Sequence, residues 1–226
     1  MTVMSWIAIV MGFGPQVSGH FTGQTPFPPL IVHLHSAAFT GWLILFTVQV
    51  LLIRSRRIDL HKKLGLTAVV LAPLMIGLGV ATNVVMQREH FEAGHEELAF
   101  MIVPFADMLV FAVLITAGMG LRKSPAAHKR LLLLATLSLL DAGFGRWIGP
   151  WISAHWGDGY FGFLAQIYLG TDLLLGVAMI YDFITRRCVH PAYFRGGAFM
   201  LMIQAAASAV YHWPAWVPVA RKLIGH

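Results

Sequence analysis

Three histidines stand at the start of apolar segments, each beside or near basic residues. They are His61, His128 and His190. Imidazole ligates transition metals, and two histidines at the same depth on neighbouring helices can hold the iron of a b-type haem. If the three segments cross a membrane in the same direction, these side chains share one depth. We therefore predict a haem b or transition-metal site there; interfacial histidines that contact lipid phosphate in a wet turn are the alternative.

Ionisable residues inside apolar segments form a second set. Asp107, Asp141 and Asp172 each fall near the middle of such a segment. An ionised side chain in lipid costs several kcal/mol unless it is paired or hydrated, and it usually faces the bundle interior. Arg146 lies five residues after Asp141, about 500° of helix rotation, so we expect it to meet an acid or Asn83 of another helix. The set predicts a buried polar network, either a clamp between helices or a path for a ligand or protons.

A third set of histidines lies on the other side of the predicted topology. It consists of His33, His35, His90 and His95, with several glutamates between residues 89 and 97. Carboxylates and imidazoles together can hold a metal ion. However, His33 and His35 are two residues apart on a helix and point about 200° apart, so both reach one ion only if the helix start is unwound. A solvated acidic loop is the alternative.

Other catalytic motifs find little support. The segment HEELAF, which starts at His95, lacks the second histidine of a zinc-protease helix, and no GxSxG elbow occurs. Cys188 is the only cysteine, so an intrachain disulfide and a CxxC redox pair are excluded. The residues therefore indicate no reaction that can be named, and whether the chain is an enzyme stays open.

The elements that must position these residues are apolar helices. The chain is 58% hydrophobic and 12% charged, too apolar for a water-soluble protein of 226 residues. Residues 30–53 hold no Asp, Glu, Lys or Arg, and at about 1.5 Å per residue they cover the hydrocarbon core of a bilayer, about 30 Å. Similar segments predict about seven helices: a short or tilted one over 3–14, then 30–53, 61–87, 98–121, 128–152, 161–185 and 194–213.

Basic residues set the polarity of these spans. Lys and Arg gather in the connections 54–63, 122–130 and 186–187, which the positive-inside tendency places in the cytoplasm. We therefore expect loops outside over 15–29 and 88–97, an amino terminus inside, and a short outer tail over 221–226 after an interfacial aromatic belt around Trp213 and Trp216.

The fold class predicted is thus an all-α polytopic bundle, a single integral domain over 1–226 in a bacterial inner membrane. The net charge of +6 comes from cations at span ends that are not interleaved with exposed aromatics. Contact with an anionic lipid bilayer explains this pattern, and a nucleic-acid partner does not.

Several motifs resemble a family of bacterial predicted membrane proteins that is defined only as a domain of unknown function. They are HLHSAAFTGWLILFTVQ from His33, LHKKLG from Leu60, HKRLL from His128, Arg146, and YDFITRRCVHPA from Tyr181. The resemblance covers nearly the whole chain and implies the multi-helix topology. It implies no activity.

For function we favour a cofactor- or ligand-binding membrane protein that holds b-type haem or a metal through the inner histidines. One alternative is a transport or binding protein for a hydrophobic or anionic small molecule, such as a quinone or lipid, that uses Arg146 and the aspartates. Another is an accessory subunit of a membrane complex with no chemistry of its own.

Overall fold

The computed structural model describes residues 1–24, 27–95 and 97–226, which are helical apart from short connections. The loops predicted over 15–29 and 88–97 include residues 25, 26 and 96, which lie outside the described residues. Within the described ranges the chain forms α-helices, one short 3-10 helix and no strand. The predicted all-α class is therefore confirmed.

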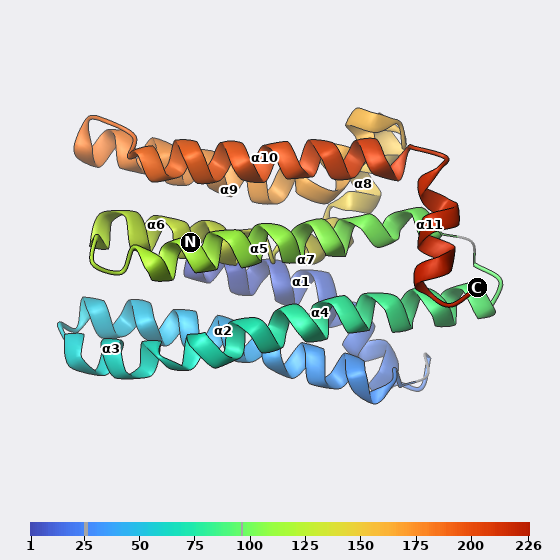
Figure 1. Cartoon of the computed structure of the whole chain (residues 1–226), viewed down its shortest axis with the longest axis horizontal. Helices are drawn as coiled ribbons and strands as arrows, with labels where there is room; N and C mark the ends of the chain where they lie inside the picture. The colour runs from blue at the N-terminus through green and yellow to red at the C-terminus, as the bar shows by residue number, and fades with distance from the viewer. Residues whose placement is uncertain (25–26, 96) are drawn as a thin grey trace.

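Three antiparallel helix pairs form the body of the molecule. In the first pair, α2 (Leu30–Arg54) lies against the stretch formed by α3 (Ile58–Gly65) and α4 (Thr67–Glu92). The second pair is α5 (Ile102–Gly120) with α6 (Pro125–Leu137), and the third is α9 (Tyr160–Arg186) with α10 (Pro191–Tyr211). Figure 1 shows the pairs stacked in layers, with α5 and α6 in the middle. The layers are held by the packing of α4 on α5 and of α10 on both α5 and α6.

The turns within the three pairs lie at one end of the bundle. They follow Arg54, Gly120 and Arg186, and Figure 1 shows all three at its left end. We call this end the basic end, because it carries the cations of the three predicted inner connections. Lys and Arg gather in turns because placing them in hydrocarbon costs free energy.

Four helical stretches are long and apolar enough to cross a membrane. They are Leu30–Arg54, Ile58–Glu92, Leu98–Gly120 and Tyr160–Arg186, where the third includes the 3-10 helix η1 (Leu98–Met101). These match four of the predicted spans. The chain is therefore an all-helical bundle with four candidate membrane spans in the described part, and the total of seven stays a prediction.

The continuous span predicted over 128–152 is wrong. Helix α6 ends at Leu137, and the chain continues as two short helices, α7 (Asp141–Trp147) and α8 (Gly149–Trp156). At the break, the Ser138 hydroxyl donates to the Ala135 carbonyl at 3.0 Å, so a local side-chain bond competes with the helical ladder. Gly143 and Gly145 weaken the helix further, because glycine has low helix propensity.

The first helix is longer than predicted. Helix α1 (Thr2–Phe21) continues through Pro15, so residues 15–21 are helical where a loop was expected. The reason is tertiary: α1 packs closely along α7, and this burial offsets the hydrogen bond that proline removes. Helix α4 likewise runs to Glu92, into the loop expected over 88–97, and an Arg88–Glu92 ion pair of 2.9 Å supports its last turn.

The predicted outer tail is a helix. Helix α11 (Trp216–Leu223) lies across the end of the bundle opposite the basic end (Figure 1). Ala220 and Ile224 pack against Leu98 and Met101, and the Trp216 indole N–H donates to the Ala99 carbonyl at 3.1 Å. The tail prediction over 221–226 missed this because an amphipathic helix of eight residues gives too short a pattern to recognise.

Candidate functional site

His61 and His128 lie together at the basic end. Their ring centroids are 6.4 Å apart, and the rings are nearly perpendicular at 83°. Nδ1 of His128 lies 2.8 Å from the carbonyl oxygen of Gly118. Because that oxygen can only accept, Nδ1 carries the proton, and Nε2 of the neutral ring is free to bind a metal. Nδ1 of His61 is buried and has no hydrogen-bond partner among the described residues.

Gln49 adds a third polar side chain to this pair. Its amide oxygen and nitrogen are both buried without a partner in the described structure, and His61 faces its backbone. Gly65 lies beside the Gln49 amide: a Cβ there would be 3.4 Å from its nitrogen, an ordinary van der Waals contact. Gln49 was not among the predicted site residues, although a glutamine inside the apolar segment 30–53 was a usable signal.

His190 is separate from this pair, so the predicted three-histidine site does not assemble. Its Nδ1 accepts from the Ala192 backbone N–H at 3.1 Å and caps α10. Burial and then the cations of Arg130 and Arg186 lower the pKa of His190. The physical reason for the separation is Pro191, which starts a new helix at once and leaves His190 as its cap.

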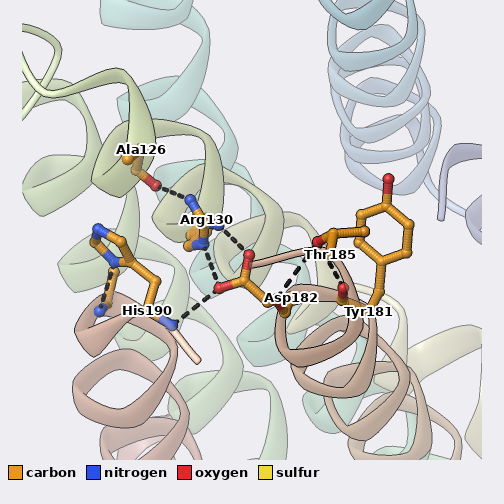
Figure 2. Close-up of polar contacts among 7 residues, drawn as sticks. Ala126, Arg130, Tyr181, Asp182, Thr185 and His190 are labelled. Carbon is orange, nitrogen blue, oxygen red and sulfur yellow. Dashed lines mark hydrogen bonds and ion pairs between the residues drawn. The ribbon is translucent and has the colours of Figure 1, made fainter. Parts of the chain in front are cut away.

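A buried ion pair lies beside His190. Arg130 of α6 and Asp182 of α9 are paired (Figure 2), with a second contact of 3.1 Å from Nε to Oδ2. Arg130 also donates to the Ala126 carbonyl at 2.6 Å, and Asp182 accepts the backbone N–H of His190 at 2.9 Å. Sequence reasoning missed this pair, because it counted Arg130 only as a cation of the turn. The usable signal was Asp182, an acid in the last two turns of α9 close to the basic residues Arg186 and Arg187.

Three aspartates, from α5, α7 and α9, come together. Asp141 begins α7, Asp107 lies on α5 and Asp172 on α9, and both act electrostatically on Asp141. We call these three residues the acid cluster. Tyr168, one turn before Asp172, is within electrostatic reach of all three and is fully buried, and its hydroxyl has no partner in the described structure. Gln204 of α10 faces Asp172 without closing a hydrogen bond.

Arg146 and Asn83 do not join the acid cluster, so the expected contact of Arg146 with an acid or Asn83 is wrong. The Arg146 guanidinium donates to the Ala142 carbonyl at 2.8 Å and lies 4.6 Å from the centroid of the Phe13 ring. Asn83 donates to the Met101 carbonyl at 2.9 Å. The cause is the short α7, which carries Arg146 to an exposed position near His35.

The predicted outer metal set is dispersed. His35 stacks on Phe39 with centroids 4.1 Å apart, and His33 is exposed. His90 and His95 lie close to each other, with centroids 6.4 Å apart. Among the described residues no group of three His, Cys, Asp or Glu side chains is arranged to hold a metal ion. The dispersal follows from helix geometry, because His33 and His35 point to different sides of α2.

No family model, no curated protein and no solved structure matches this chain. The resemblance to a family of unknown function therefore stays a prediction. Function must be inferred from the two sites themselves: the His61–His128 pair at the basic end and the acid cluster inside the bundle.

Proposed function

We propose that the chain is a multi-pass protein of a bacterial inner membrane that binds haem iron between His61 and His128. The observation that carries the proposal is the ring separation of 6.4 Å together with the Gly118 carbonyl that orients the His128 ring. Two imidazoles on opposite sides of one metal ion need about 6 Å between centroids, since each N–metal bond is about 2 Å and each ring adds about 1 Å. The pair has this spacing.

The protonation of the pair supports ligation. A metal-binding histidine usually donates its other ring N–H to a carbonyl or carboxylate, which sets the tautomer and orients the ring. The Gly118 carbonyl does this for His128 at 2.8 Å. For His61, the backbone of Gln49 lies beside the ring and suits the same orienting role.

The number of ligands favours haem over a single metal ion. A structural zinc site needs four protein ligands and a catalytic one needs three, whereas a porphyrin already supplies four nitrogens to its iron, so one or two protein ligands are enough. His61 and His128 supply two, and the neighbouring Gln49 contributes only an amide, which is not a usual zinc ligand. His61 lies on α3 and His128 on α6, and α3 packs on α2 and α4 rather than along α6. Binding of a flat group between the two histidines would therefore not disrupt a large helix–helix contact. Lys62 and Lys129 follow the two histidines and suit propionates.

An absorption spectrum tests this proposal. The protein purified in detergent, with haem added if it is colourless, should give the reduced-minus-oxidised spectrum of a b-type haem. His61→Ala and His128→Ala should each abolish it. His190→Ala is the matched control, because it removes a histidine at the same end of the bundle and should leave the spectrum unchanged. A preparation that stays colourless after haem addition and contains no metal contradicts the proposal.

The proposal includes the predicted topology of about seven helices with the amino terminus inside and the carboxyl terminus outside. Its support is the gathering of the three cation-rich turns at the basic end (Figure 1), since Lys and Arg favour the cytoplasmic side. On this topology His61 and His128 lie near the inner surface of the bilayer.

A second candidate function is the binding of a lipid or quinone at Arg146. Arg146 is exposed beside Phe13 and His35, and a cation on a lipid-facing helix needs a polar partner. Native mass spectrometry should then detect a retained amphiphile that Arg146→Leu releases. Detection of no ligand on the wild-type chain contradicts this candidate.

A further inference from the structure

The break between α6 and α7 exposes a carboxyl group to the interior of the bundle. Asp141 is the first residue of α7 and is only 2% exposed. One backbone group freed at the break is satisfied, because the Thr171 hydroxyl donates to the Leu137 carbonyl at 3.4 Å. The Asp141 carboxyl is different, because its Oδ1 has no partner in the described structure.

The groups that face Asp141 are acidic or neutral. Helix α5 contributes Asp107, and α9 contributes Asp172, Tyr168 and Thr171. Helix α1 packs against α7 through Ala8 and Gly12, which do not titrate. Helix α10 contributes the neutral Gln204 beside Asp172.

Cations lie elsewhere. Arg146, on α7 itself, turns to Phe13, and Arg130 of α6 is paired with Asp182 at the basic end. In the described part of the chain none of the acid cluster forms an ion pair. The interior around Asp141 therefore holds three carboxyl groups with no compensating positive charge from the protein.

Such a group is stable only with a bound cation or bound protons. One ionised carboxylate in the hydrocarbon region costs several kcal/mol, and like charges at close range add to this cost. The acid cluster is not among arrangements that could hold a metal ion in the described residues. A proton needs neither a cavity nor several ligands, so it satisfies the charge requirement where a metal ion does not.

A second observation points to the same ligand. Tyr168 is fully buried, its hydroxyl has no partner among described residues, and it lies within electrostatic reach of all three acids. A phenol both donates and accepts a hydrogen bond, so it can bridge a carboxylic acid and a carboxylate. Leaving it unpaired would cost about 1–3 kcal/mol.

We infer that the acid cluster is a proton-binding site, in which Asp141 holds a proton inside the bundle and exchanges it with Asp107 and Asp172. Asp141 is the most buried of the three, and Asp107 and Asp172 are half-buried on the neighbouring helices. In each exchange the O–H bond of one carboxylic acid breaks and an O–H bond forms on a neighbouring carboxylate. No electron is transferred and no other reactant is consumed.

Dicyclohexylcarbodiimide tests the inference, since it forms an adduct with protonated carboxyl groups in apolar surroundings. The full-length protein in detergent or lipid should take up the reagent at Asp141 or at its partners at neutral pH, as peptide mass analysis shows. Asp141→Asn should abolish the adduct at position 141, and replacement of all three acids by Asn should abolish labelling of the cluster. Asp59→Asn, at an exposed acid of α3, is the control that should leave labelling unchanged.

An infrared measurement on the wild-type chain avoids dependence on a variant that fails to fold. The C=O stretch of a protonated carboxylic acid should be present at neutral pH and should disappear only at alkaline pH. Absence of both the adduct and this band shows that all three acids are ionised and overturns the inference. Protection from the reagent by Na⁺ at constant pH also overturns it, because the site then binds a metal cation.

Discussion

Arg130 and Asp182 form an ion pair whose two side chains are only 2% and 5% exposed. The pair joins α6 to α9, and the same carboxylate accepts the backbone N–H of His190 at 2.9 Å, which ties in the start of α10. Figure 2 shows Asp182 between Arg130 and the backbone of His190. One carboxylate therefore holds together three helices at the basic end.

Asp182→Asn should destabilise the protein by about 3–5 kcal/mol, because removal of one partner leaves the Arg130 charge buried without compensation. Thermal unfolding in detergent measures this. Arg88→Gln is the matched control: it breaks the Arg88–Glu92 pair, whose side chains are 58% and 49% exposed, and exposed pairs contribute about 0–1 kcal/mol.

Replacement of both partners tests the same cause. The double variant Arg130→Met with Asp182→Leu should recover much of the stability that Asp182→Asn loses, because no buried charge remains. If Asp182→Asn proves no more destabilising than Arg88→Gln, the pair does not form in the protein.

Stability at the start of α10 should depend on pH through His190. Burial and the cations of Arg130 and Arg186 lower the pKa of His190 below its ordinary value of 6.5. The unfolded chain then binds this proton more readily than the folded one, so stability is complete above about pH 6.5 and falls as the pH drops below it. Protonation also removes the Nδ1 acceptor that caps α10. Unfolding temperatures measured across this pH range give the dependence.

Two variants separate the cap from the titration. His190→Asn keeps a good capping side chain that does not titrate, so it should flatten the pH dependence with little loss of stability. His190→Ala should lose about 1 kcal/mol above about pH 6.5, and the loss should shrink at lower pH, where protonation removes the same cap from the wild type. A His190→Asn profile as steep as that of the wild type would show that another group causes the dependence.

Gly12→Ala should weaken the attachment of α1. A Cβ at Gly12 would overlap the carbonyl oxygen of Gly143, and one at Gly143 would lie 2.7 Å from the Ala8 carbonyl oxygen, so the two backbones must separate. We expect a loss of about 1–3 kcal/mol in thermal unfolding. Gly14→Ala is the control on the same helix: no atom lies within 4 Å of its Cβ, so it should be neutral or gain about 0.5–1 kcal/mol. Equal effects of the two variants would contradict the close packing of α1 on α7.

Cys188 reports the orientation of the bundle. It is a free, exposed cysteine in the turn between α9 and α10, at the basic end. If that end is cytoplasmic, a membrane-impermeant maleimide should label it in inside-out membrane vesicles and leave it unlabelled in right-side-out vesicles. Gln24→Cys in a Cys188→Ser background, between α1 and α2, should show the reverse pattern. Labelling of Cys188 from the outside would invert the proposed topology.

The sequence by itself determined the features that depend on local composition. Segments as apolar as residues 30–53 can only be long helices or buried ones, and a cation-rich turn such as the one after Arg54 cannot lie within the bilayer. The helical class, four of the candidate spans and the common end of the basic turns follow from these local facts. The proximity of His61 and His128 also follows from the sequence, because each lies near the start of a helix that begins at a basic turn.

Only the tertiary structure decided which side chains meet. Like His61 and His128, His190 stands at the start of a helix, but its side chain caps α10. Arg146 faces Phe13 rather than an aspartate because α7 is short. The break after Leu137 and the partnership of Arg130 with Asp182 depend on the rotation and the neighbours of each helix. The length of an apolar segment predicts neither the rotation of the helix about its axis nor which helices it packs against. Lipid and the interior of a membrane bundle favour similar apolar residues, so the sequence does not mark which face is buried.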